Sequence, residues 1–358
     1  MRVDGKQYQS IWLENNRLNI INQNLLPWIF EVKELKNSID IINSIKNMEV
    51  RGAPLIGVTA AFGVYFACKE AKNKTEFFQI ISQLKESRPT AINLNNAVDR
   101  ILNNITDFGD QDNNSKSSLQ EAIKLMEEEK ESSKKIGRNG LKIIEEIYKK
   151  NSQRTLNILT HCNAGWLACV DYGTALAPIY AAFDKGLSIH VWVDETRPRN
   201  QGSRLTAWEL GKHGVPHTII PDNTGGYLMQ KNMVDLCIVG SDRTSKNGDV
   251  FNKIGTYLKA LAAKDNNIPF YVAFPSSTID NNAKTVSADV PIEQRTTDEV
   301  KYIEGYIDNR IQKILLTPEN SPVANYAFDI TPAKLITAYI TEKGVFKESS
   351  IAHKLISS

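Results

Sequence analysis

The chain has 358 residues, of which 41% are hydrophobic and 23% are charged. This composition supplies a buried core and excludes a disordered protein, and at about 100–200 residues per domain the length predicts two domains. Basic and acidic residues number 43 and 41, giving a net charge of +2. A charge this balanced argues against charge-driven binding to nucleic acid or to a membrane surface.

The cysteines and the N-terminus indicate where the protein works. None of the four cysteines forms a C-x-x-C pair, which favours reduced thiols in a cytoplasm: Cys68, Cys162, Cys169 and Cys237. The first residues, MRVDGKQYQSIW, lack the apolar segment of a secretory signal. The longest mostly apolar run, from Ala53 to Cys68, is shorter than the roughly 20 residues that span a bilayer. We therefore expect a soluble, cytoplasmic protein.

The first third of the chain reads as mainly helical. Residues 1–50 contain short alternating stretches, which predict a small antiparallel element followed by a helix. Apolar periodicity predicts helices over 53–72 and 93–103, with Pro89 and Thr90 marking the start of the second.

A polar stretch and a long helical pattern follow. Residues 103–117 are polar and aperiodic and predict a surface loop, whereas 118–150 are helical in pattern, with interruptions expected near Gly137 and Gly140. Within this stretch we interpret the acidic run 127–129 as a solvated helix face rather than a metal site. We place a domain boundary near residue 132, which gives a mainly helical domain over 1–132.

Residues 133–358 predict an α/β domain with a parallel sheet. Short apolar runs alternate with helical patterns, as in βαβ units. The runs are Leu156–Thr160, Ser188–Val193, His217–Ile220, Leu236–Val239 and Pro269–Phe274. Each run ends in a polar, often glycine-containing segment, and ligands bind beyond the carboxyl ends of parallel strands. The sequence therefore predicts an active site at this edge of the sheet.

The absence of several familiar motifs argues against the classes of enzyme that carry them. The chain has no G-x-G-x-x-G after its first predicted parallel strand, and no G-x-x-x-x-G-K-[ST], H-E-x-x-H or G-x-S-x-G. Dinucleotide, P-loop, zinc-protease and serine-hydrolase interpretations thus lose their main support.

A cysteine and an aspartate remain as candidates. Cys162 follows the first strand, where a strand turns into a helix. Backbone N–H groups there favour its thiolate and an apolar pocket opposes it, and a buried, inert thiol is the alternative. Asp242 follows a later strand and is either a helix N-cap or a general acid/base. We interpret Cys169 and Cys237 as core residues of a helix and a strand, and His161 as a loop histidine rather than a metal ligand.

Candidate anion-binding residues lie elsewhere in the chain. Arg51, Gly52 and Ala53 precede a proline at the start of an apolar helix, so they form either a phosphate cradle or an ordinary helix start. Arg88 and the pair Asn252–Lys253 supply further candidates.

Six segments together resemble, in order and spacing, the 5-methylthioribose-1-phosphate isomerase family. They are RGAPLIGVTAAFGV, SRPTAINLNNAVDRI, LTHCNAG followed by YGTAL, DETRPRNQGSRLTAWEL, GSDRTSKNGDVFNKIGTY and AFDITPAKLIT, and they cover almost the whole chain. That family is related to regulatory subunits of the eukaryotic translation-initiation guanine-nucleotide exchange factor. Its fold is a small, mainly helical N-terminal domain followed by a Rossmann-like α/β domain, usually in a homodimer.

The resemblance implies roles for individual residues. Cys162 and Asp242 match the catalytic pair. The positions that hold the sugar phosphate are matched by Arg51, Ala53, Arg88, Gln201, Asn252 and Lys253. The implied reaction is an aldose-to-ketose isomerisation of a small sugar phosphate without metal or redox cofactor. The alternatives are isomerisation of 5-deoxyribose 1-phosphate or ribose 1,5-bisphosphate, and a non-catalytic regulatory subunit.

Overall fold

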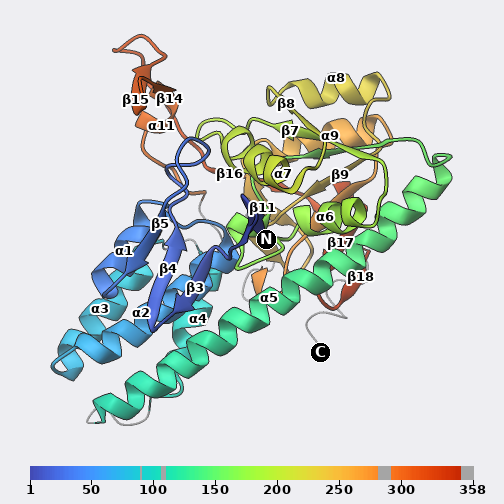
Figure 1. Ribbon diagram of the computed structural model, residues 1–358. Helices are drawn as coiled ribbons and strands as arrows, with labels where there is room; N and C mark the ends of the chain where they lie inside the picture. Colours follow the sequence, from blue (N-terminus) through green and yellow to red (C-terminus); the bar gives the residue numbers. More distant parts are fainter. Residues whose placement is uncertain (89–90, 106–109, 281–291, 348–358) are drawn as a thin grey trace.

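The computed structural model describes residues 1–88, 91–105, 110–280 and 292–347 (Figure 1). Figure 1 shows the N-terminal helices gathered at one end of the molecule and a large sheet with its covering helices at the other. The long helix α5 runs along both parts. Among the described residues, no helix is both long and apolar enough to cross a membrane. Pro89 and Thr90, expected to start a helix, lie outside the described residues.

The N-terminal part packs four helices and a small sheet around one apolar helix. The predicted antiparallel element is confirmed as β3–β4–β5, and the predicted helices as α1, α2 and α4, whereas α3 had no counterpart in the sequence interpretation. Helix α2 is apolar on nearly all sides because its neighbours enclose it. The elements are β1 (Arg2–Val3), β2 (Lys6–Gln7), β3 (Ile11–Glu14), β4 (Arg17–Ile21), β5 (Val32–Leu35), α1 (Ser38–Lys46), α2 (Ala53–Glu70), α3 (Lys74–Glu86), α4 (Ile92–Leu102) and α5 (Gln111–Lys150).

Helix α5 is longer and more continuous than the sequence predicted. The expected loop over 103–117 is wrong from residue 111 onward, because the side chain of Asp110 accepts a hydrogen bond from the N–H of Asn113 and caps the helix there. The expected interruption at the two glycines is also wrong. A Cβ on Gly140 would lie 2.3 Å from Pro178 of α6, so the absence of side chains at Gly137 and Gly140 lets the two helices approach closely. Residue 132 lies inside this continuous helix.

The acidic run on α5 is solvated only in part, so the predicted solvated face is wrong for Glu129. Glu127 and Glu128 are exposed and pair with Lys130 and Arg100. Glu129 is buried instead. Its side chain faces the segment Ser276–Thr278 and accepts a hydrogen bond from the hydroxyl of Ser277 at 3.2 Å. Burial raises the pKa of Glu129 to about 7.

A seven-stranded sheet forms the second part and confirms all five predicted strands. Its order is β18-β17-β12-β9-β6-β7-β8, parallel throughout except for β18. Alternate residues of each strand enter different cores: Ile158 faces α5 and α6, and Leu159 faces α8 and α9. Its strands are β6 (Leu156–Thr160), β7 (Ile189–Asp194), β8 (His217–Ile220), β9 (Leu236–Val239), β12 (Phe270–Ala273), β17 (Ala338–Thr341) and β18 (Gly344–Phe346).

A smaller four-stranded sheet, in the order β13-β10-β11-β16, and a separate hairpin, β14–β15, had no counterpart in the predicted elements. The strands are β10 (Arg243–Ser245), β11 (Val250–Lys253), β13 (Ile279–Asp280), β14 (Tyr302–Ile307), β15 (Arg310–Leu315) and β16 (Phe328–Thr331). The remaining helical segments are η1 (Trp166–Ala168), α6 (Leu176–Asp184), η2 (Gly202–Thr206), α7 (Ala207–His213), α8 (Thr224–Gln230), α9 (Thr256–Asp265), η3 (Ser276–Thr278), α11 (Asp298–Lys301) and η4 (Ala333–Leu335).

The strand order locates the functional edge. Read in chain order from β6, the six parallel strands follow the doubly wound order 3-2-1-4-5-6. Such a sheet binds ligands where the order reverses, here between β6 and β9. Cys162 follows β6 and Asp242 follows β9.

The buried carboxyl of Glu129 makes a testable prediction about stability. Because its folded pKa of about 7 lies above the ordinary value of 4.5, the contribution of this carboxyl to stability is fully present below pH 4.5 and is lost as the pH rises through 7. Glu129→Gln removes this ionisable group. The free energy of unfolding of the variant minus that of the wild type should therefore be about 3 kcal/mol larger at pH 8 than at pH 4. Urea unfolding across this range measures the difference.

The exposed neighbour Glu127 provides the matched control. Glu127→Gln should shift the free energy of unfolding by a similar small amount at every pH. A pH-independent difference for Glu129→Gln would contradict the buried, protonated carboxyl.

Candidate active site

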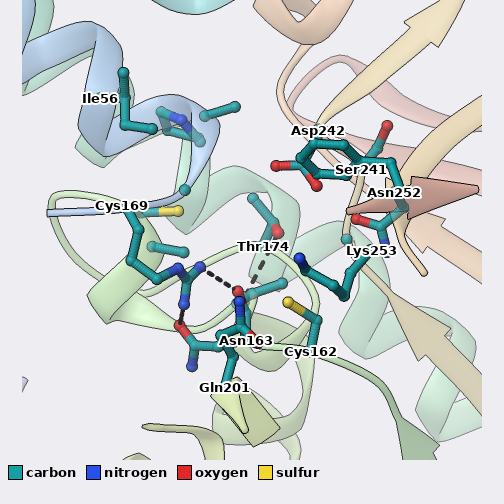
Figure 2. Close-up of a pocket in the computed structure, with 18 of the residues that line it drawn as sticks. Ile56, Cys162, Asn163, Cys169, Thr174, Gln201, Ser241, Asp242, Asn252 and Lys253 are labelled. Atoms are coloured by element: carbon teal, nitrogen blue, oxygen red, sulfur yellow. Dashed lines mark hydrogen bonds between the residues drawn. The ribbon is translucent and has the colours of Figure 1, made fainter. Parts of the chain in front are cut away.

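One cavity lies at the reversal point of the sheet, between the start of α2 and the loops after β6 and β9. The empty space in it, counted together with the solvent at its open mouth, is about 690 Å³. Nine candidate residues line it together: Arg51, Gly52, Ala53, Arg88, Cys162, Gln201, Asp242, Asn252 and Lys253. Figure 2 shows Cys162, Asp242 and Lys253 pointing towards one central space.

The start of helix α2 forms one wall of the cavity. Gly52 has φ +93°, and a Cβ there would lie 2.5 Å from the carbonyl oxygen of Ala168. Only glycine therefore permits this close approach between α2 and the segment after β6. The N–H groups of the first helical turn have no carbonyl acceptor within the helix, so those of Gly52 and Ala53 are suited to bind an anion.

Arg51 ties this wall to the loop after β6. Its guanidinium donates hydrogen bonds to the side-chain oxygen and to the carbonyl oxygen of Asn163, at 2.5 and 2.6 Å. Asn163 in turn donates to Glu209 of α7 at 2.8 Å. Glu209 also accepts the N–H groups of Trp166 and Leu167, and burial raises its pKa to about 7 against these hydrogen bonds.

Sequence reasoning did not single out Asn163 or Glu209. A signal was present, because Glu209 stands among apolar residues in LTAWEL, where a charge has to be paired when buried.

Cys162 lies in a loop before the short helix η1, with a left-handed φ of +64°. Its N–H donates to the hydroxyl of Thr196 at 2.9 Å, and its carbonyl accepts from Thr206. Burial raises the pKa of the Cys162 thiol, while Arg51 and Lys253 act in the opposite direction. Of the two opposing effects expected from the sequence, burial is the larger, and the neutral thiol is favoured.

Asp242 is not a helix N-cap, because the chain continues directly into strand β10. Burial raises the pKa of its carboxyl, against the nearby charges of Lys253, Arg51 and Arg88. The protonated acid is thereby favoured, which suits a group that donates a proton.

Three cationic side chains border the cavity: Arg51, Arg88 and Lys253. Burial lowers the pKa of Lys253, opposed by Cys162 and Asp242, and also that of Arg88, opposed by Glu293. Nε and Nη1 of Arg88 are buried with no hydrogen-bond partner among the described residues, as is Oε1 of Gln201. Buried donors without acceptors are costly, so the cavity favours an anionic ligand rich in oxygen.

Three sequence interpretations concern residues beside these. Cys237 is buried in β9 as predicted, but Cys169 follows η1 rather than lying in a helix, and it lines the cavity although buried. His161 lies in the loop after β6, as predicted. The lining also includes apolar residues that the sequence did not reveal, among them Met48, Ile56 and Phe328.

Comparison with known proteins identifies the family. The initiation factor 2 subunit family matches residues 49–348. The methylthioribose-1-phosphate isomerase of Desulfatibacillum aliphaticivorans is 53% identical over 98% of this chain and 96% of its own, and that of Sulfurimonas denitrificans is 52% identical over 94% and 95%. The chain belongs to the methylthioribose-1-phosphate isomerase family.

Two solved structures, one of an isomerase and one of a translation initiation factor subunit, resemble this chain over nearly its whole length. The 5-methylthioribose 1-phosphate isomerase of Pyrococcus horikoshii OT3 superposes with a TM-score of 0.82 at 36% identity, covering 98% of this chain and 96% of that one. The translation initiation factor eIF-2B, subunit delta, of A. fulgidus superposes with a TM-score of 0.75 at 39% identity, covering 95% and 96%.

The close approach at Gly52 makes a second prediction. Gly52→Ala adds a Cβ that collides with the Ala168 backbone and strains φ, so we expect a loss of at least about 3 kcal/mol in the free energy of unfolding. Gly186, with φ +83° and open space around its Cβ position, is the control, and Gly186→Ala should lose only about 1 kcal/mol. Equal losses in urea unfolding would show that the contact with Ala168 is unimportant.

Proposed function

We propose that the protein converts 5-methylthio-α-D-ribose 1-phosphate to 5-methylthio-D-ribulose 1-phosphate, an aldose-to-ketose isomerisation of methionine salvage. The observation that carries this proposal is the meeting of Cys162 and Asp242 in one cation-lined cavity at the reversal point of the sheet. The near full-length similarity to isomerases of this substrate supports the choice of sugar.

The phosphate is held by the cations and by the start of α2. Nε and Nη1 of Arg88 are buried without a partner among the described residues, Lys253 is buried, and the N–H groups of Gly52 and Ala53 lie at the positive end of the helix dipole. Gln201 and Asn252 line the same cavity and bind sugar hydroxyl groups or phosphate oxygens.

The substrate poses a particular chemical problem. Its anomeric oxygen carries the phosphate, so the ring cannot open by ordinary hemiacetal chemistry. Asp242, whose pKa is raised by desolvation, donates a proton to the ring oxygen as the bond from that oxygen to C1 breaks. It recovers a proton from the C2 hydroxyl as that group becomes the ketone, so the acid is regenerated.

Hydrogen also moves from C2 to C1, and Cys162 assists this transfer. The hydrogen moves either as a proton, through an enediol-type intermediate, or as a hydride in a direct shift. Both routes give the same product from the same atoms and electrons, and both benefit from a pocket that excludes water. Burial favours the neutral thiol, so Cys162 adds no negative charge beside the phosphate.

The organisation around this site completes the proposal. Residues 1–132 form a mainly helical domain that closes over the edge of the Rossmann-like α/β domain, residues 133–358. The protein acts as a cytoplasmic homodimer on a small sugar phosphate, without nucleic acid, membrane, metal or redox cofactor. The four free cysteines accord with a reducing compartment.

The reaction itself is the third prediction. Chelator-treated protein incubated with 5-methylthioribose 1-phosphate should form the ketose, followed by the C1 and C2 carbon signals in NMR. Cys162→Ser and Asp242→Asn should each lower kcat by at least about 100-fold, because each removes a group that moves hydrogen. Cys68→Ser and Asp298→Asn, outside the cavity, are the controls and should stay within twofold of the wild type. Near-normal turnover by Asp242→Asn would refute its role.

Substrate preference is the fourth prediction. Met48, Ile56 and Phe328 offer an apolar surface to the methylthio group, and the three cations suffice for one phosphate. Loss of the methylthio group in 5-deoxyribose 1-phosphate should lower kcat/KM about tenfold, and ribose 1,5-bisphosphate should react at least 1,000-fold more slowly. Comparing kcat/KM for the three sugars decides the point, and a preference for the bisphosphate would reassign the substrate.

A further inference from the structure

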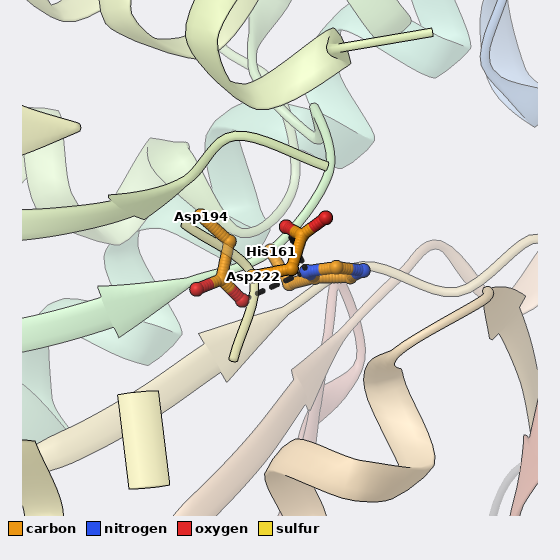
Figure 3. A group of neighbouring side chains, drawn as sticks. All are labelled: His161, Asp194 and Asp222. Carbon is orange, nitrogen blue, oxygen red and sulfur yellow. Dashed lines mark hydrogen bonds and ion pairs between the residues drawn. The ribbon is translucent and has the colours of Figure 1, made fainter. Parts of the chain in front are cut away.

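A buried cluster of charged side chains lies directly behind Cys162. His161 follows β6, Asp194 is the last residue of β7 and Asp222 follows β8, and Figure 3 shows the imidazole facing both carboxylates. Nδ1 of His161 is 2.8 Å from Oδ2 of Asp194 and 4.0 Å from Oδ1 of Asp222. Lys259 of α9 brings its ammonium to 3.1 Å from the same Asp194 oxygen and donates to the carbonyl oxygen of Asp222.

The geometry is that of an ion-pair network and not of a metal centre. Two ligand atoms bound to one zinc ion at about 2.0–2.2 Å stand more than about 3 Å apart, whereas Nδ1 and Oδ2 are in direct hydrogen-bond contact. The ammonium of Lys259 already provides a positive charge beside Asp194. The imidazole has no free lone pair either, because Nε2 lies 2.8 Å from the carbonyl oxygen of Ile254.

The two contacts of the imidazole join the two sides of the cavity. His161 immediately precedes Cys162, and Ile254 immediately follows Lys253. The contact with Asp194 anchors the Cys162 segment to the end of β7, and the contact with Ile254 anchors the Lys253 segment at the end of β11. The ring also packs against Gly255, where a Cβ would lie 2.9 Å away.

We propose that His161, held by Asp194, is a positioning residue that fixes Cys162 relative to Lys253 through its two ring nitrogens. The proposal rests on the proposed isomerase function and adds a residue to it. Both ring nitrogens lie 2.8 Å from oxygen atoms, so the ring contacts the two segments at the same time. Asp194 and Asp222 face the ring together with Lys259, whose ammonium pairs with Asp194.

Two variants separate the two contacts. The amide nitrogen of Asn reaches the place of Nδ1 and that of Gln the place of Nε2. His161→Asn keeps the bond to Asp194 and frees Ile254, so KM should rise at least fivefold because Lys253 is released. His161→Gln keeps the bond to Ile254 and frees Asp194, so kcat should fall at least tenfold with a smaller change in KM because the Cys162 segment is loosened. His213→Gln, which breaks an ion pair with Asp184 away from the cavity, is the control.

A readout without substrate keeps this test independent of the proposed reaction. Alkylation of Cys162 by iodoacetamide, followed by mass spectrometry of its peptide, should be at least threefold faster in His161→Gln than in the wild type or in His213→Gln. Unchanged alkylation together with unchanged kcat and KM in folded variants would overturn the proposal. Failure of the wild type to isomerise the sugar, with the alkylation difference present, would refute the substrate and leave the positioning role standing.

The wild type offers a measurement that needs no variant. In protein labelled with ¹⁵N-histidine, one histidine should show ring N–H signal that is protected from exchange with solvent, because the ring is buried and both nitrogens are in contact with protein oxygens. Of the four histidines among the described residues, His161 is the most deeply buried. Rapid solvent exchange at every imidazole ring would contradict the proposed positioning role even if the substituted proteins failed to fold.

Discussion

The buried contact between Arg51 and Asn163 is the constraint on which the cavity depends. A buried guanidinium has to be paired, and here both partners belong to one residue after β6. Asn163 is itself held by Glu209, so the start of α2 is connected through polar contacts to α7 behind the sheet. Gly52 then brings the helix backbone against Ala168. The cavity exists because two parts of the chain meet at this paired charge.

Burial moves the ionisable groups of the cavity towards their neutral forms. It raises the pKa of Cys162 and of Asp242 and lowers that of Lys253. A phosphate dianion placed among them favours the protonated form of all three groups. In the proposed reaction, substrate binding therefore favours the cationic form of Lys253, which holds the phosphate, and the protonated form of Asp242, which gives its proton to the ring oxygen. Binding and acid catalysis are thus linked through one electrostatic field.

The sequence predicted the parallel strands and the edge of the sheet where the candidate residues gather, because short apolar runs followed by polar segments are local signals. It did not predict the order of the strands, which depends on long-range pairing, or the small sheet that carries Asn252 and Lys253. The errors on α5 have the same origin. The sequence predicts a break at Gly137 because it does not show the contact with α6, and it predicts a solvated Glu129 because it does not show the contact with Ser277.

The same limit explains why the supporting residues of the site were missed while the candidate pair was found. Cys162 and Asp242 stand out by residue type and position. The proposed role of His161, in contrast, depends on its contacts with residues at the ends of β7 and β11, which are distant in the sequence. The backbone here is strained: Cys162 and Thr196 both adopt a left-handed φ, which is costly for a β-branched threonine. Thr196 is held there by its N–H to Asp222, and its hydroxyl accepts the N–H of Cys162. The loops after the strands therefore fix the position of Cys162, and the contacts of Arg51 and Gly52 hold the start of α2 beside it.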